Sequence, residues 1–334
     1  MANKDQQQCC EKFKTMIGGQ ALIEGIMMRG PENDAIVVRG KEGLQVEVTP
    51  RKLPEEKSVL RWPLIRGAVN FFDAQVTGVK ALMRSADLSP EEGGEESQSK
   101  LDAWLEKKLG NEKFQQFIIG MAVFMGLGMS ILLFFLLPGV ISSFFDRWIP
   151  NMLLLHLVEG VVRMAIFMSY MLLVSRMQEM KRVFAYHGAE HKTIRCYEAG
   201  LELTVENVRK QTRKHPRCGT SFLLVVMIIS ILVFSIASSA LLACIPALEA
   251  MRGSFLFRLI MIVFKLALLP VVVAFSYEIN RWVGRHDNWL TRIMTAPGLW
   301  FQNFTTNEPD DGMIEVGIAA LKAVLPQEEG SDRW

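Results

Sequence analysis

The sequence predicts a mainly α-helical membrane protein with about four transmembrane helices and a small N-terminal cytoplasmic α+β region. Two observations lead to this fold class. Half of the 334 residues are hydrophobic. In addition, no charged residue occurs between Lys113 and Asp146 or between Arg217 and Glu249, and each of these runs exceeds the roughly 20 residues that a helix needs to cross a bilayer. Such runs exclude an ordinary soluble enzyme and a disordered chain.

An N-terminal region, residues 1–86, is expected in the cytoplasm or on the membrane surface. Residues 35–40 and 44–50 have the composition of two short strands joined by a turn, which predicts a hairpin. Residues 63–85 carry apolar side chains at helical spacing, which predicts an amphipathic helix on the membrane surface or against the bundle. Residues 87–115 begin with an acidic, Gly/Ser-rich stretch and predict a flexible linker that leads into the first span.

The membrane domain is predicted over residues 116–283. Its four spans are expected at about 117–145, 152–175, 220–247 and 254–277. The loop 176–219 carries ten Lys and Arg residues, whereas the connections near 146–151 and 248–253 carry one each. The positive-inside rule therefore places this loop and both termini in the cytoplasm.

The C-terminal region, residues 284–334, is expected to form cytoplasmic helices and a tail. Asp287 is the expected cap of a first short helix. A second helix is expected near residues 312–324. Within the loop 176–219, a short helix is expected from Thr204.

The loop 176–219 holds three of the five histidines. His187 and His191 are four residues apart, so on a helix they share one face and can bind one metal ion. With Glu190 they form the pattern H-x-x-E-H, the inverted zinc-protease motif, in which the Glu acts as general base. The sequence therefore predicts a divalent metal site, with zinc as the expected ion.

Two histidines leave such a site incomplete, because catalytic zinc usually has three protein ligands and an open position. His215 and Cys218, spaced H-x-x-C, are the nearest candidates for the remaining ligands. Glu278, at the expected cytoplasmic end of the fourth span, is a further candidate.

Three other interpretations of these residues stay open. The two histidines and Glu190 can be a solvated polar face of a helix. A closed site of all three histidines of the loop with Cys218 can be structural zinc that holds the loop without catalysis. Cys218 can also act as a thiolate nucleophile paired with a histidine.

A charged cluster is expected within the membrane. His156, Glu159 and Arg163 follow one another on one side of the second span, and Lys265 on the fourth span lies near mid-depth, within reach of Glu159. Because charges in a bilayer are costly, they indicate either a functional pathway or a structural lock between the two spans.

A glycine-rich stretch, residues 17–31, precedes the expected hairpin. It holds Gly18 and Gly19, and Glu24 and Arg29 stand among its apolar residues. The stretch matches no nucleotide-binding spacing. We expect either a membrane-surface loop over the metal site or strands with glycine turns.

Four strings of residues together resemble the bacterial YqhQ-like family, also called domain of unknown function 1385. They are GGQALIEGIMMRG, HGAEHK, HPRCGTSF and SYEINRW. The resemblance covers about residues 12–325. It implies a multi-pass protein of the bacterial plasma membrane that is metal-dependent, and it supports attention to the His, Glu and Cys residues above without assigning a reaction.

The first functional hypothesis is a zinc-dependent hydrolase. Its site would face the cytoplasm, and its substrate would be a membrane-embedded or membrane-adjacent peptide or lipid. The alternative is a non-enzymatic factor that assists the assembly or quality control of another membrane protein, with a structural metal site. A weaker alternative is a small-solute or ion transporter. The expected partners are the lipid bilayer and a membrane protein or peptide, and no nucleic acid.

Overall fold

The computed structural model describes residues 12–51, 58–89, 111–145, 148–149, 151–251, 253–328 and 330–333. The chain divides into two compact units that alternate along the sequence. Unit 1 comprises Met1–Pro90, Tyr170–Ile229 and Leu269–Trp334, and unit 2 comprises Glu91–Ser169 and Ser230–Leu268. Most of the predicted acidic linker lies outside the described residues.

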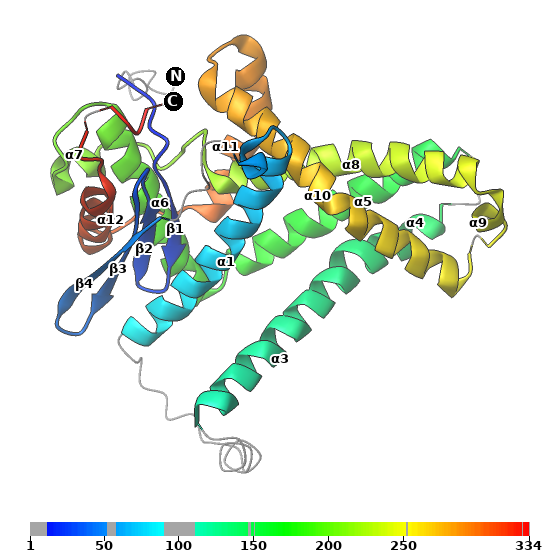
Figure 1. Ribbon diagram of the computed structural model, residues 1–334, viewed down its shortest axis with the longest axis horizontal. Helices are drawn as coiled ribbons and strands as arrows, with labels where there is room; N and C mark the ends of the chain where they lie inside the picture. The colour runs from blue at the N-terminus through cyan, green and yellow to red at the C-terminus, as the bar shows by residue number, and fades with distance from the viewer. Residues whose placement is uncertain are drawn as a thin grey trace. The chain divides into compact units, whose positions relative to one another are not determined.

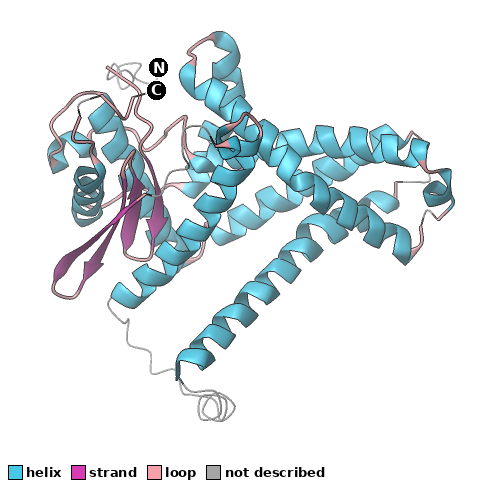
Figure 2. Cartoon of the chain, viewed as in Figure 1, coloured by secondary structure: helices cyan, strands magenta, loops and turns pink. Residues whose placement is uncertain are grey.

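Unit 1 contains a four-stranded antiparallel sheet in the order β1-β2-β3-β4, drawn in magenta in Figure 2. The strands are β1 (Gly18–Leu22), β2 (Gly25–Arg29), β3 (Asn33–Gly40) and β4 (Gly43–Pro50). The last two are the predicted hairpin. The glycine-rich stretch forms strands β1 and β2 and not a loop, and Glu24, with φ 50°, lies in the turn between them.

Helices cover both faces of this sheet (Figure 1). On one face, Ile26 and Met28 of β2 belong to a core with residues of α6 (Gln178–Glu198) and α12 (Asp311–Val324). On the other face, Met27 packs with Ala81 of α1 (Ile65–Leu88). Because alternate residues of a strand point to opposite faces, β2 is buried on both sides.

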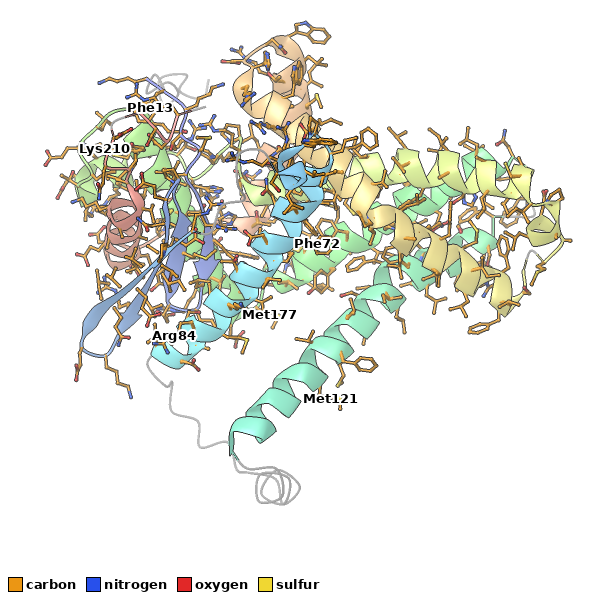
Figure 3. The ribbon with its side chains drawn as sticks, in the orientation of Figure 1. Phe13, Phe72, Arg84, Met121, Met177 and Lys210 are labelled. Carbon is orange, nitrogen blue, oxygen red and sulfur yellow. The ribbon has the colours of Figure 1, made fainter. Side chains whose placement is uncertain are left out.

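Helix α1 corresponds to the predicted amphipathic helix. It approaches the C-terminal part of α10 (Phe255–Arg285) so closely that a Cβ on Gly67 would lie 3.1 Å from the Cα of Ala274. Phe72 and Arg84, both labelled in Figure 3, lie on this helix. Arg84 pairs with Glu47 of β4, and Phe72 is 56% exposed. An exposed apolar stripe on an amphipathic helix is typical of helices at a membrane surface.

Four helical segments among the described residues are long and apolar enough to cross a membrane: Gly120–Ser143, Leu153–Val174, Gly219–Cys244 and Phe255–Arg285. The first joins α3 (Asn111–Ile131), a π-helical turn (Leu132–Leu136) and α4 (Leu137–Ser143), and the others belong to α5 (Met152–Val174), α8 (Gly219–Cys244) and α10. They coincide with the four predicted spans, and the fourth is longer than expected. Four such helices are compatible with a membrane protein.

Unit 2 is held together by close packing of these helices. A Cβ on Gly160 of α5 would lie 2.6 Å from the side chain of Ile231 in α8, so only glycine permits this approach. The guanidinium of Arg163 lies over the rings of Phe135 and Phe234, 5.3 and 5.4 Å from their centroids. A short helix, α9 (Pro246–Ala250), follows α8.

The segment 176–219 is largely helical and not an extended loop, because α6 occupies half of it. Thr204 caps α7 (Val205–Arg209), as predicted. The predicted cap at Asp287 is wrong: Asn288 caps α11 (Trp289–Thr305), because its side chain accepts from the amide of Thr291 while Asp287 pairs with Arg292.

The two ends of the described chain meet in unit 1. Thr15 forms an isolated antiparallel bridge with Arg333. The hydroxyl of Thr15 also donates to the Asp332 carboxylate at 2.6 Å. The predicted helix near 312–324 is α12, which begins at an Asp310 cap shortly before this meeting point.

Candidate metal centre

Helix α6 positions the H-x-x-E-H motif in the interior of unit 1. One side of α6 packs on β1 and β2 and another on α12, so nearly every residue from Phe184 to Glu198 is at least partly buried. His187 and His191 lie one turn apart, and their ring centroids are 4.3 Å from each other. The predicted shared face of the two histidines is therefore present.

Cys218, which immediately precedes α8, completes a three-residue group. Its Sγ lies 3.2 Å from Nε2 of His187. The ligand atoms of His187, His191 and Cys218 all lie within 4.8 Å of one another, and all three residues are buried. Two imidazole nitrogens and one sulfur at this separation form a donor set suited to zinc.

Backbone carbonyls fix the orientation of both imidazoles. Nδ1 of His187 lies 2.8 Å from the carbonyl oxygen of Thr305, and Nδ1 of His191 lies 2.6 Å from that of Arg213. A carbonyl only accepts hydrogen bonds, so each Nδ1 carries a proton and Nε2 is the ring nitrogen left to bind a metal ion. Histidines that bind a metal usually donate their other ring N–H to a carbonyl or carboxylate in this way.

The Nε2 atom of His191 is buried and has no hydrogen-bond partner among the described residues. Burying a polar atom without a partner costs free energy. A metal ion bound by Nε2 would remove this cost, so the orphaned nitrogen fits the donor set.

Glu190 lies beside the two histidines and is 5% exposed. The amide of Gly19 donates to its carboxylate, whereas Oε2 has no partner among the described residues. A Cβ on Gly19 would lie 3.0 Å from Cγ and Cδ of Glu190, so the glycine permits the approach. Burial raises the pKa of Glu190 above its ordinary value, the direction expected of a carboxylate that acts as a general base.

The charge state of Cys218 suits a ligand thiolate. Burial opposes ionisation, but the imidazoles of His191 and His187 lower the pKa of the Cys218 thiol well below its usual range. The amide of Thr220, in the first turn of α8, also donates to Sγ at 3.4 Å. Although burial disfavours its charged form, the Cys218 sulfur raises the pKa of His187 to about 9.

His215 lies next to this group but faces another partner. Its Nε2 lies 3.1 Å from the carboxylate of Glu198, which also accepts from Arg217 and from the amide of Thr15. Burial opposes ionisation, but these donors lower the pKa of Glu198 to about 2. The His191 and His215 ring centroids are 5.7 Å apart. A role of His215 as a ligand stays a prediction.

The other predicted site residues of unit 1 lie outside the three-residue group. Glu278 pairs with Arg66 of α1 at 2.5 Å. The carboxylate of Glu24 accepts from Arg182 of α6 and from the hydroxyl of Tyr186. Arg29 pairs with two aspartates of the same unit. The strands β1 and β2 thus contact α6 at both Gly19 and Glu24.

The charged cluster of unit 2 is assembled as a compact group. Nζ of Lys265 lies 2.5 and 2.6 Å from the two carboxylate oxygens of Glu159. Arg163 donates to the same carboxylate at 2.7 Å and to the carbonyl of Phe134 at 2.7 Å. Nδ1 of His156 lies 3.6 Å from Glu159.

Several residues that shape the His–His–Cys group carry no signal in the sequence. The carbonyls of Thr305 and Arg213 act through backbone atoms, which every residue has. Gly188 permits α6 to approach the chain after α11, because a Cβ there would lie 2.0 Å from the carbonyl oxygen of Asn307. Gln302 of α11 holds the segment before α8 through both the amide and the carbonyl of His215.

Comparison with known proteins gives a family without a known reaction. The family described as "Protein of unknown function (DUF1385)" matches residues 62–327. The "Uncharacterized protein YqhQ" of Bacillus subtilis (strain 168) is 31% identical over 344 aligned positions, which cover 96% of each chain. No solved structure matches the chain.

Proposed function

The chain belongs to the DUF1385 family, and from the geometry of its His–His–Cys group we propose that it is a zinc-dependent membrane enzyme of the hydrolase type. His187, His191 and Cys218 would hold the ion. Glu190 would accept and return a proton during the reaction. The substrate would be a peptide or lipid in or beside the membrane, and the site would face the cytoplasm.

The observation that carries this proposal is the pair of fixed imidazoles. Both Nδ1 atoms donate to backbone carbonyls, so Nε2 is the ring nitrogen that each histidine offers to a metal ion, near Sγ of Cys218. A polar face exposed to solvent would need neither the burial nor the fixed ring orientations.

Three protein ligands and an adjacent carboxylate favour a catalytic over a structural site. Structural zinc usually has four protein ligands, whereas catalytic zinc keeps one position open. When bound, zinc supplies a Lewis acid and makes water easier to deprotonate. Glu190 has one oxygen held by the Gly19 amide and the other without a partner among the described residues, so Oε2 is available to take a proton.

The position of Cys218 supports a substrate at the membrane. The residue that follows it, Gly219, is the first residue of a helix apolar enough to cross a bilayer. A group built at the end of such a helix would meet substrates at the membrane surface. The excess of Lys and Arg in residues 176–219 supports the cytoplasmic side.

The first experiment is metal analysis by mass spectrometry on detergent-purified protein prepared without chelator. We expect about one zinc ion per chain in the wild type and in Glu190→Gln, and none in His191→Ala. The matched control is His286→Ala, which removes an exposed histidine and should leave zinc unchanged. A folded wild type without metal would refute the proposal.

The second experiment separates catalysis from a structural role. Hydrolysis of fluorogenic phospholipids and peptides in mixed micelles should be lost in Glu190→Gln although its zinc is retained. Retained hydrolysis in this variant would exclude Glu190 as the base. If Glu190→Gln is fully functional in cells and a membrane protein co-purifies in equal amount, the assembly-factor alternative would replace the enzyme.

A second candidate function rests on the short contact between His187 Nε2 and Cys218 Sγ. A thiolate beside an imidazole can attack an ester or amide without metal. This candidate predicts a burst of p-nitrophenol from p-nitrophenyl acetate that survives chelation and disappears in Cys218→Ala. The zinc proposal predicts instead that bound metal protects Cys218 from iodoacetamide.

A further inference from the structure

Unit 2 contains a cavity that the proposed enzyme does not use. Its volume is about 90 Å³. It is lined by residues of α4, α5 and the N-terminal part of α10, together with residues next to these helices. The space is large enough for a small ionised group.

The polar side chains at this cavity carry an excess of positive charge. His156, Glu159, Arg258 and Lys265 all line it. Arg163 already neutralises Glu159 through a hydrogen bond of 2.7 Å. Lys265, whose side chain is 8% exposed, therefore adds a buried cation that no second described carboxylate balances.

Two further groups at the cavity have unused hydrogen-bonding capacity. Nε2 of His156 is buried without a partner among the described residues, and the His156 side chain is 9% exposed. Arg258 is half-buried and forms no ion pair with any residue that the structure describes. A structural lock would need only the pairs around Glu159, so it leaves Arg258 and the His156 nitrogen without a role.

We propose that this cavity binds the anionic headgroup of an acidic phospholipid, between Arg258 and Lys265. The two residues are seven apart on α10, so they lie on one face about two turns from each other. Both side chains are long enough to converge on one phosphate. The ligand would balance the excess buried charge, which is costly within a bilayer.

The other lining residues favour a lipid over a free anion. Most are apolar, and Phe257, Met261 and Ile262 follow the face of α10 between the two cations. Nearby Leu256 and Leu259 are exposed, as expected for helix surfaces that contact acyl chains. A free phosphate would gain nothing from this apolar surface.

Native mass spectrometry of the full detergent-solubilised chain tests the proposal with defined lipids. We expect phosphatidylglycerol to be retained about tenfold better than phosphatidylethanolamine with the same acyl chains. Arg258→Gln and Lys265→Met should each abolish this preference. Arg258→Gln breaks no described ion pair and Lys265→Met leaves the Glu159–Arg163 pair intact, so both variants should fold.

The matched control is Lys210→Gln, which removes one exposed positive charge from unit 1 (Lys210 is labelled in Figure 3). It should keep the preference for phosphatidylglycerol. Equal retention of the two lipids by the wild type, or an unchanged preference in both cavity variants, would overturn the proposal. Displacement of phosphatidylglycerol by inorganic phosphate, with phosphate retained, would assign the cavity to a free anion and would also overturn it.

Discussion

The substitution Gly188→Ala tests whether the close approach of α6 to the chain after α11 controls the metal centre. The new Cβ would lie 2.0 Å from the carbonyl oxygen of Asn307, whereas ordinary contacts are 3.4–4 Å. The segment that contains Asn307 must therefore move away from α6 by more than 1 Å. Asn307 is held to α6 by its amide, which donates to Phe184, so the movement also reaches Thr305, whose carbonyl orients His187.

Two effects on stability oppose each other in this variant. Overpacking costs about 1–3 kcal/mol, and replacing a helical glycine by alanine recovers about 1 kcal/mol. The net destabilisation should therefore not exceed about 2 kcal/mol. The effect on the proposed zinc binding should be larger, because loss of the hydrogen-bond partner of a metal-bound histidine typically weakens metal binding by about 10–100-fold.

Competition with a chromophoric chelator would measure zinc affinity, and thermal unfolding in detergent would measure stability. The matched control is Gly219→Ala, beside Cys218, because a Cβ there meets nothing within 4 Å. The control should bind zinc like the wild type. Wild-type zinc affinity in Gly188→Ala, with the higher unfolding temperature that helix propensity alone would give, would refute the reasoning.

Three further predictions concern stability in detergent. Glu198→Gln should lower the free energy of unfolding by about 2–3 kcal/mol at neutral pH. Because the pKa of Glu198 is lowered in the fold, the stabilisation by its carboxylate is fully present above the pKa of an unfolded carboxyl and is lost as the pH falls toward 2. Unfolding temperatures of variant and wild type should therefore converge in acid, and a constant gap would contradict the charge-based explanation. Glu159→Ala should lower the free energy of unfolding by about 3–5 kcal/mol, since it leaves buried cations unpaired, and Lys265→Met should lower it clearly less. Equal losses of stability in the two variants would argue against an excess of positive charge at the unit 2 cavity. Asp310→Ala removes the side chain that accepts from the amide of Met313 at 2.8 Å and should cost about 1 kcal/mol, measured by chemical unfolding, whereas no loss would show that the cap is dispensable.

The apolar spans and the paired histidines could be predicted because each depends on local spacing. Charge-free runs identify the membrane helices, and a separation of four residues places His187 and His191 on one face of α6. The spacing H-x-x-C, by contrast, suggests His215 and Cys218 equally as ligands. In the fold, Cys218 lies with the two histidines of α6, whereas His215 contacts Glu198, which is buried at the end of α6.

The remaining parts of the fold and of the candidate site depend on contacts between segments that are far apart in the sequence. Strands β1 and β2 are short and contain glycine, so no alternating pattern marks them. In the fold they pair with each other, and β2 packs with residues of α6 and α12. The same is true of Gly19, whose missing side chain matters because the Glu190 carboxylate occupies that space. The spacing of residues in the sequence cannot show that a distant side chain fills this space.

The bridge between Thr15 and Arg333 has a consequence for how the protein matures. The amide of Thr15 donates to Glu198, and its hydroxyl donates to Asp332, so the first and last described segments close together around the buried end of α6. During synthesis, the segment that contains Asp332 leaves the ribosome long after the histidines. The interior of unit 1 therefore stays incomplete until translation has passed this residue, and we expect the proposed metal ion to bind after synthesis. A protease cut before Asp332 should then leave a chain that keeps His187, His191 and Cys218 and does not retain the proposed ion.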